Sequence, residues 1–235
     1  MGFWYSVVQF FEHGGVFMYP IVLILALGVG IAVERYITLT LVGKKNRQTW
    51  DKIDPMLHRG EFEQARDVAN KDDSTIAQLL SSGLARQGAV RRREDLDRAM
   101  EETLMAIMPR LEKRTHYLAT FANMSTLAGL LGTIIGLIDA FTAVSKADIA
   151  DKAELLSASI SIGMNCTAFG LMVAIPLVLV HSLLQTKTTE IIDSLEMVSV
   201  KIVNSIAERV SYVRPPAKGT EGGAPMPHAP VPSHA

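Results

Sequence analysis

The sequence contains very few of the residues from which covalent catalysts and metal centres are built. Its 235 residues include a single cysteine, so one chain can form neither an internal disulfide nor a thiolate metal cluster. It has no phosphate-binding loop, no H-E-x-x-H zinc motif and no G-x-S-x-G nucleophile motif. We therefore expect no enzymatic activity, no metal and no cofactor.

A strong net charge is also absent. The 23 Lys and Arg residues nearly balance the 24 Asp and Glu residues, which leaves a formal net charge of −1. No basic patch is interleaved with aromatic residues, which is the pattern expected of a nucleic-acid interface. We expect no nucleic-acid partner.

What the sequence does contain is long uncharged apolar runs. Apolar residues make up 49% of the chain and charged residues 20%, so the charges must be segregated from the apolar segments. Uncharged runs cover residues 16–33, 117–138 and 155–180. A helix rises about 1.5 Å per residue, so each run can cross a hydrocarbon core of about 30 Å. The sequence predicts an all-α membrane protein with spans at 16–40, 115–144 and 155–185.

Positive charge is distributed unevenly around these spans. No Lys or Arg precedes Arg35, whereas most of the 23 lie between residues 41 and 114. Cytoplasmic loops are enriched in Lys and Arg, so this bias places the N-terminus outside and the 41–114 segment in the cytoplasm. Spans two and three then enclose a short external loop at 145–154, and a cytoplasmic helix follows at 186–213.

The two ends of the chain differ from the spans. Aromatic residues crowd positions 3–11, which predicts an interfacial helix within an N-terminal segment, 1–15. Residues 214–235 are rich in proline and glycine and have little apolar bulk, which predicts a disordered tail.

The cytoplasmic segment 41–114 shows helical spacing of its apolar residues. One or two short helices are expected from about residue 53 to residue 68, broken or bent around Gly60. Thr75 and Gln78 resemble a capping box that opens a second helix, and a third helix starts near Glu94. Pro109 bends this third helix without ending it, so we expect one continuous rod into the second span.

Small residues line one face of the second span. Gly129, Gly132 and Gly136 recur at helical spacing and allow another helix to approach closely, and packing alone is one explanation for each. Thr133 lies on the same strip, so its hydroxyl either lines a pore or bonds back to the preceding turn. Asp139 either attracts cations at a pore mouth or marks a solvated helix end.

Two polar strips run along the third span. The first strip is small and hydroxylated and contains Ser159, Gly163, Thr167 and Gly170. We expect Ser159 and Thr167 to face an ion path, and the two glycines to pack against another helix. The second strip contains Ser161 and Asn165 and points elsewhere, towards a neighbouring helix. A lone three-helix chain should be unable to cover small-residue faces on both spans, so we expect a closed homo-oligomer.

Ionisable residues cluster near the span ends. Glu34 and Arg35 close the first span, where snorkelling to the interface explains them. His13, His116 and His181 also lie near span ends and could titrate near neutral pH. Nothing in the sequence places these histidines in a proton relay.

Three motifs carry a resemblance. Residues 129–141, G-L-L-G-T-I-I-G-L-I-D-A-F, resemble the second-span signature of the MotA/TolQ/ExbB proton-channel family. Residues 166–176, C-T-A-F-G-L-M-V-A-I-P, resemble its third-span signature, and A-V-E-R-Y at 32–36 closes the first span. The resemblance covers roughly residues 15–210, and the three-span topology favours the ExbB/TolQ branch over the four-span flagellar stators.

The resemblance implies a bacterial inner-membrane homopentamer around the single helices of two ExbD/TolR/MotB-like partner subunits, with lipid around the ring. In that family the partner contributes a protonatable Asp, and threonines that match Thr133 and Thr167 face it. The sequence departs from the family at Thr126, where a proline is usual, and at Ile162, where ExbB has an acid.

The function that this resemblance implies is an ion-channel subunit, with protons favoured over sodium, that couples the ion motive force to work on the envelope. A gliding-type motility stator of the same family and a non-conducting membrane scaffold are the alternatives. A scaffold needs only glycines and alanines on its packing faces, so the hydroxyls on these faces favour the channel.

Overall fold

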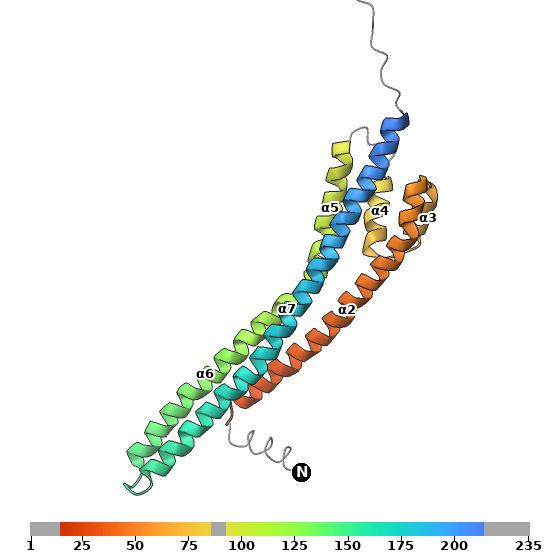
Figure 1. Ribbon diagram of the computed structural model, residues 1–235. Coiled ribbons are helices and arrows are strands. Elements are labelled where there is room, and N and C mark those ends of the chain that lie inside the picture. The colour runs from red at the N-terminus through yellow and green to blue at the C-terminus, as the bar shows by residue number, and fades with distance from the viewer. Residues whose placement is uncertain (1–14, 86–92, 214–235) are drawn as a thin grey trace, which may run out of the picture.

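The computed structural model describes residues 15–85 and 93–213 of the chain (Figure 1). This part of the chain is all-helical, as predicted. The interfacial segment expected at 1–15 lies almost wholly outside the described residues, as does the tail at 214–235, and both stay predictions. The helices are α2 (Met18–Arg59), α3 (Phe62–Asn70), α4 (Thr75–Ala85), α5 (Arg93–Glu112), α6 (Thr115–Lys146) and α7 (Lys152–Val213).

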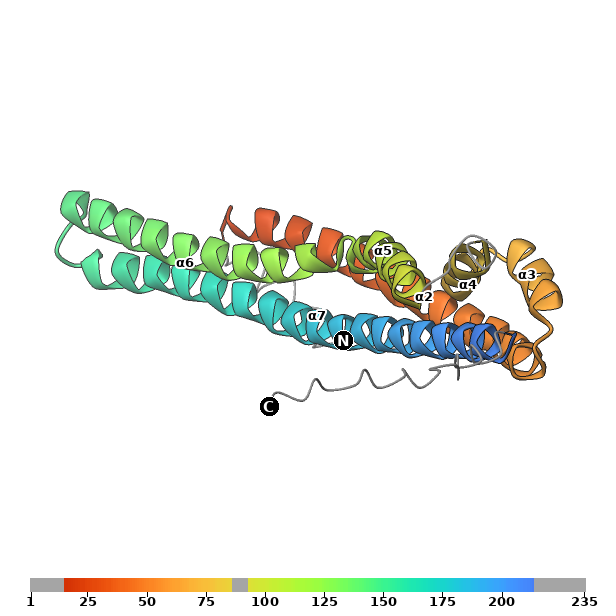
Figure 2. The ribbon, with the colours of Figure 1, turned by 90° about the horizontal axis from the view of Figure 1, so that it is seen from above.

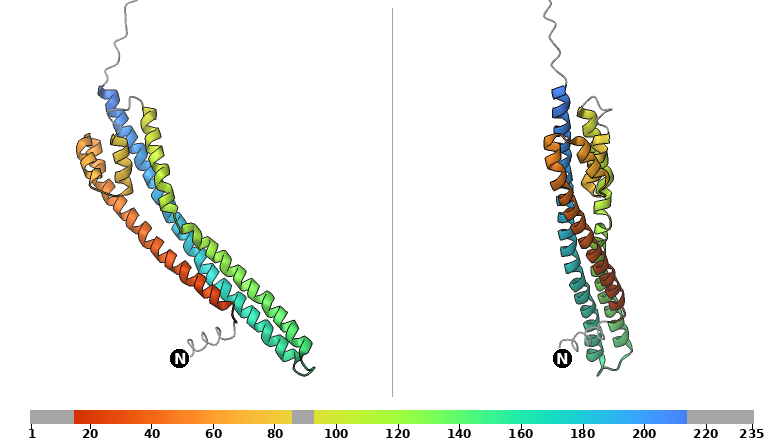
Figure 3. Two further views of the ribbon diagram at one scale, coloured as in Figure 1. Left: turned by 180° about the vertical axis from the view of Figure 1, so that it is seen from behind. Right: turned by 90° about the vertical axis from the view of Figure 1, so that its right-hand side faces the viewer.

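The molecule is an elongated bundle with two unlike ends. α6 and α7 form a long antiparallel hairpin, and α2 lies against them (Figures 1 and 3). The shorter helices α3, α4 and α5 gather beside the far ends of α2 and α7 (Figure 2). Three helical segments are long and apolar enough to cross a membrane, namely Met18–Arg59, Arg93–Lys146 and Lys152–Ile206. The predicted number of spans is confirmed.

Burial differs between the two ends. The end with α3, α4 and α5 has a core like that of a soluble protein, with Ile53, Leu80, Met100, Leu195 and Ile202 fully buried. Along the α6–α7 hairpin, large apolar side chains remain exposed instead, among them Leu127, Ile134, Ile138, Phe141 and Met172. Such a surface is suited to lipid or to other membrane helices, not to water.

α2 runs well beyond the first predicted span. The separate helices expected from residue 53 are wrong in part, because Ile53 and Leu57 belong to the last turns of α2 itself. The predicted break is at the expected place: α2 ends at Arg59 and is capped by Gly60, whose φ of 76° is a left-handed conformation that glycine adopts without strain. The Gly60 amide donates to the Leu57 carbonyl at 3.0 Å and so closes the helix.

α4 begins where the sequence predicted a helix, but its cap is one residue earlier. The Ser74 hydroxyl accepts from the Ala77 amide at 3.2 Å, and this is the bond that Thr75 was expected to make. Asn46 of α2 provides a second cap for α4, because its side-chain Oδ1 accepts a hydrogen bond from the Thr75 amide at 3.1 Å. A side chain distant in sequence therefore completes the start of α4.

The continuous rod expected from α5 into the second span is wrong. α5 ends at Glu112, α6 begins at Thr115, and between them Arg114 has a left-handed φ of 67°. Arg114 donates to both carboxylate oxygens of Glu34 at 2.7 Å. The neighbouring Arg35 is only 4% exposed, so the expected snorkelling is also wrong for this residue.

Arg35 explains how the break is stabilised. Its guanidinium donates to the main-chain carbonyl of Leu111 and to the Thr115 hydroxyl. In an uninterrupted helix the Leu111 carbonyl would accept from the Thr115 amide, so the arginine replaces the hydrogen bond that the break removes. Helix α7, by contrast, continues without interruption from the third span through Pro176 to Val213. This confirms the helical rod that was predicted to extend beyond the third span.

Candidate functional site

The glycines of the second and third spans lie where α6 and α7 touch. A Cβ added at Gly129 would lie 3.1 Å from the Thr167 Cα, and one added at Gly136 would lie 3.1 Å from the Gly163 Cα. One added at Gly170 would lie 2.7 Å from the Ser125 carbonyl oxygen. Because these neighbours are backbone atoms, any side chain here would push the helices apart.

The two small-residue faces therefore cover each other within one chain. The expectation that a lone chain could not cover both is wrong, and the glycines by themselves give no reason for a second copy. Close approach also brings polar groups into reach, because the Ser125 hydroxyl donates across the contact to the Gly170 carbonyl at 2.9 Å.

One edge of this contact faces α2. A Cβ added at Gly132 would lie 2.4 Å from the Cys166 sulfur and 3.5 Å from the Cβ of Phe17, the residue just before α2. Thr133 follows Gly132, and Thr167 follows Cys166. Each step of one residue turns the side-chain direction by about 100° around its helix. Because α6 and α7 are antiparallel, the steps from Gly132 to Thr133 and from Cys166 to Thr167 turn towards the same side of the contact. Both threonines thus lie on the side away from α2.

The two threonine hydroxyls meet there. Thr133 Oγ1 and Thr167 Oγ1 are hydrogen-bonded to each other. The Thr167 hydroxyl donates to the Gly129 carbonyl at 2.8 Å, and the Thr133 hydroxyl lies 3.2 Å from the Gly163 carbonyl. Both side chains are half-buried. The pair is satisfied inside the chain yet remains open on one side.

The remaining predicted site residues do not join this pair. Asp139 is exposed on α6, beyond the start of α2, and Ser161 is exposed on α7. Ser159 is half-buried, and its carbonyl oxygen lies 3.2 Å from a Cβ added at Gly136, so it contributes backbone to the helix contact. Asn165 is half-buried and lies on a different face of α7 from Thr167, as its spacing predicted.

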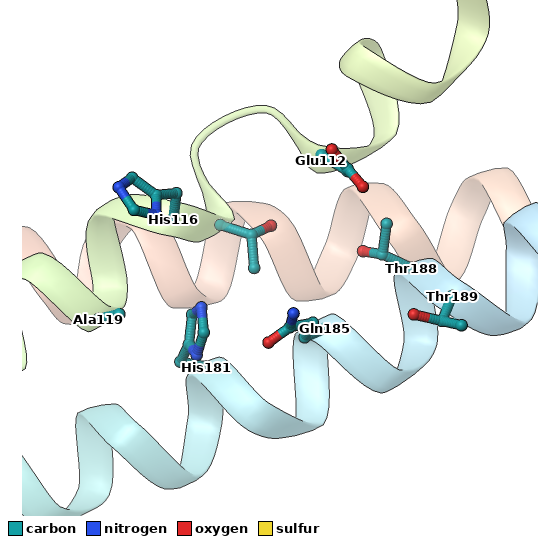
Figure 4. Close-up of a pocket in the computed structure, with 8 residues that line it drawn as sticks. Glu112, His116, Ala119, His181, Gln185, Thr188 and Thr189 are labelled. Carbon is teal, nitrogen blue, oxygen red and sulfur yellow. The ribbon is translucent and has the colours of Figure 1, made fainter. Parts of the chain in front are cut away.

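The structure brings together two histidines that the sequence left apart. A pocket of about 300 Å³ lies at the break between α5 and α6, facing α7 (Figure 4). His181 points into it from α7, and His116 lies on the first turn of α6 (Figure 4). The pocket is lined by Glu112, Thr115, His116, Ala119, His181, Gln185, Thr188 and Thr189.

The only sequence signal for this pocket is a seven-residue spacing. Thr167, His181 and Thr188 are separated by multiples of seven, and so are Thr133 and Ala119 on α6. A step of seven returns nearly to the same helix face. The pocket therefore lies on the same side of the α6–α7 hairpin as the threonine pair. Fourteen residues, about 21 Å along α7, separate Thr167 from His181.

Residues 71–197, more than half of the chain, match the model of the MotA/TolQ/ExbB proton channel family. The chain belongs to this family. Members of this family are channel proteins and not enzymes, which agrees with the lack of catalytic motifs. The matched segment contains the break, the threonine pair and both pocket histidines.

Similar family members include ExbB and TolQ proteins. An ExbB homologue of Methanothermobacter thermautotrophicus is 26% identical over 200 residues, covering 84% of this chain and 70% of its own. An ExbB-like protein of Synechocystis is 29% identical, covering 78% of this chain and 72% of its own. The Tol-Pal system protein TolQ of Haemophilus influenzae is 35% identical over 94 residues, covering 40% and 41%. The resemblance drawn from the motifs is confirmed.

The two departures from the family pattern have defined surroundings here. Thr126, where a proline is usual, donates its hydroxyl to the Ala122 carbonyl at 3.2 Å and leaves α6 unbroken. Ile162, where ExbB has an acid, is 40% exposed, and its Cγ2 lies 3.1 Å from a Cβ added at Gly15. An apolar side chain at this position contributes no proton-carrying group to α7.

Proposed function

We propose that this chain is a proton-conducting subunit of an ExbB/TolQ-like motor in the bacterial inner membrane. Several copies, five by resemblance to the family, form a closed ring around single-span ExbD/TolR-like partner helices. The partner's membrane carboxylate carries the proton, and the proton motive force is coupled to work on the envelope. The observation that supports this best is the pairing of Thr133 with Thr167 on one open side of the α6–α7 hairpin.

The chemistry of this pair suits a carboxylate that gains and loses a proton. A buried carboxylate is costly unless hydrogen-bond donors compensate its charge. Each threonine hydroxyl can rotate between a carbonyl of its own chain, at Gly129 or Gly163, and an incoming carboxylate. The pair therefore offers donors to the charged form and acceptors to the protonated form.

One further observation supports the ring, and another supports the orientation of the chain in the membrane. The α6–α7 hairpin exposes large apolar side chains such as Ile134, Ile138 and Phe141, which neighbouring copies, partner helices and lipid would cover. Most of the Lys and Arg residues lie between residues 41 and 114, in the second half of α2 and the segment that leads to α6. This bias favours a cytoplasmic location for α3, α4 and α5 and a periplasmic N-terminus.

The test is the double variant Thr133→Val, Thr167→Val, which keeps side-chain shape and removes both hydroxyls. Losing such a donor destabilises a buried carboxylate by about 1–3 kcal/mol, so proton flux should fall at least about tenfold while the partner still co-purifies. Flux is measured with a pH-sensitive dye in proteoliposomes that contain this chain and a single-span partner. Asn165→Ala is the control, because its side chain lies on another face of α7.

The scaffold alternative rests on the same contacts, because both hydroxyls already have carbonyl acceptors within the chain. Wild-type flux in the double variant would remove the pore role, and a wild-type complex that assembles but conducts no protons would favour the scaffold. Native mass spectrometry in mild detergent tests the ring: we expect a pentamer, and a clean monomer in several detergents would contradict it.

A further inference from the structure

The pocket at the α5–α6 break has a composition unlike the rest of the hairpin. Its lining combines two imidazoles, a carboxylate, an amide and three threonine hydroxyls. A volume of about 300 Å³ has room for several water molecules, each of which takes up about 30 Å³ in the liquid. A polar pocket with room for water, at the end of an apolar span, suits a place where water and protons are exchanged.

The position of the pocket relates it to the threonine pair. α2 lies behind the pocket in Figure 4, and none of the described lining residues comes from α2. Both features therefore lie on the side of the hairpin away from α2. His181 follows Thr167 by fourteen residues on nearly the same face of α7, and Ala174, a small residue, lies halfway between them. Ala174 leaves room at this register, and the larger Leu171 and Val178 lie beside it at the edges of the same face.

The structure of the break keeps the pocket open. Because α5 ends at Glu112, the chain turns away before α6 begins, and Arg35 fixes the turn through Leu111 and Thr115. Arg114 is directed to Glu34 on α2. The titratable side chains that line the pocket among the described residues are therefore Glu112 of α5, His116 of α6 and His181 of α7.

We propose that this pocket is the cytoplasmic proton-release site of the pathway, with His181 as the group that accepts the proton. This inference rests on the proposed function. The proton leaves the partner carboxylate, reaches an imidazole nitrogen of His181 through water, and passes from the imidazolium to cytoplasmic water. Imidazole suits this step because it takes up and releases protons near neutral pH. Glu112 and His116, both exposed, form the outer rim of the pocket.

The first experiment measures proton flux through the complex of the full chain with its single-span partner. We expect His181→Gln to lower flux about tenfold and to flatten its dependence on cytoplasmic pH. His58→Gln is the matched control, because His58 is exposed on the last turn of α2 and lies outside the pocket. Imidazole added on the cytoplasmic side should restore flux to His181→Ala, because the pocket has room for it.

Rescue by imidazole separates a missing proton acceptor from a misfolded variant. A wild-type complex without flux contradicts the proposed function and this inference with it. Wild-type flux and an unchanged pH profile in His181→Gln contradict this inference alone and leave the proposed function standing.

The second experiment does not depend on flux. In histidine-labelled protein, NMR detects contact between each imidazole and water. A release site in this pocket predicts that water reaches the His181 imidazole. An imidazole shielded from water would refute the release site.

Discussion

Arg35 donates to the main-chain carbonyl of Leu111, the group that a continuous helix would have paired with the Thr115 amide. The relationship joins the first span to the junction between the cytoplasmic helices and the second span. A buried cation next to an interrupted helix is stable only when each partner satisfies the other.

Arg35→Met should destabilise the protein by about 1–3 kcal/mol, because the Leu111 carbonyl and the Thr115 hydroxyl lose their donor in a buried place. Arg35→Lys should be intermediate, since lysine keeps the charge but cannot reproduce the two-pronged donor geometry. Arg47→Met, at an exposed position on the same helix, is the control. Thermal unfolding in detergent provides the measurement, and equal stability of Arg35→Met and wild type would contradict the bridging role.

Gly136→Ala should weaken the α6–α7 contact. The added methyl group would lie 3.1 Å from the Gly163 Cα, and a backbone atom cannot move aside as a side chain can. Overpacking of this kind costs about 1–3 kcal/mol. Gly30→Ala is a matched control on α2, because nothing lies within 4 Å of a Cβ added there. The midpoint of unfolding should fall for Gly136→Ala only. Equal midpoints for Gly136→Ala and Gly30→Ala would show that the α6–α7 contact accommodates the added methyl group.

Asp72 should make the cytoplasmic end sensitive to acid. Burial by itself would raise the pKa of this carboxyl, but hydrogen bonds from Thr49 and the Ser74 amide, together with Lys45 at 3.2 Å, bring its pKa below the usual value. A carboxyl with a lowered folded-state pKa stabilises the fold above its unfolded-state pKa of about 4, and this contribution is lost as the pH falls through the folded-state pKa.

Stability of wild type should therefore decline below about pH 4 more steeply than that of Asp72→Asn, which lacks the titrating group. Asp73→Asn, one residue along the chain and exposed, should follow the wild-type curve. Chemical denaturation at a series of pH values measures the difference. Parallel curves for Asp72→Asn and wild type would mean that the Asp72 contacts contribute nothing to folding.

Single cysteines should report the orientation of the chain. Gln78 on α4 and Asp148 in the α6–α7 connection are both exposed, whereas Cys166 is buried and should stay unlabelled in the parent. In intact spheroplasts an impermeant maleimide should label Asp148→Cys and leave Gln78→Cys unreacted, and inside-out vesicles should give the reverse. Labelling of Gln78→Cys in spheroplasts would overturn the proposed topology.

Local pattern was enough to predict much of the fold. Long uncharged runs required three apolar helices, because only helices satisfy the backbone across lipid. A left-handed glycine ended α2 at the predicted place, since Gly60 adopts that conformation without strain. The family was also readable, because its motifs at 129–141 and 166–176 are short and contiguous.

The sequence could not predict contacts made between distant segments. Pro109 was the visible helix breaker, yet the interruption came at Arg114, because Glu34 and Arg35 lie beside that turn only in the folded chain. The capping by Asn46 and the burial of Arg35 have the same origin. Each depends on a partner more than twenty residues away, and no local pattern records it.

The sequence by itself determined that this chain has three apolar spans, that small and hydroxylated residues share helix faces, and that its family is that of the MotA/TolQ/ExbB channels. Period and composition act within one helix, so they are visible in one segment. Only the tertiary structure decided that the two glycine faces cover each other, that Thr133 meets Thr167, and that His116 and His181 share a pocket. These relationships depend on the register between the antiparallel helices α6 and α7. Close packing of the two backbones determines that register.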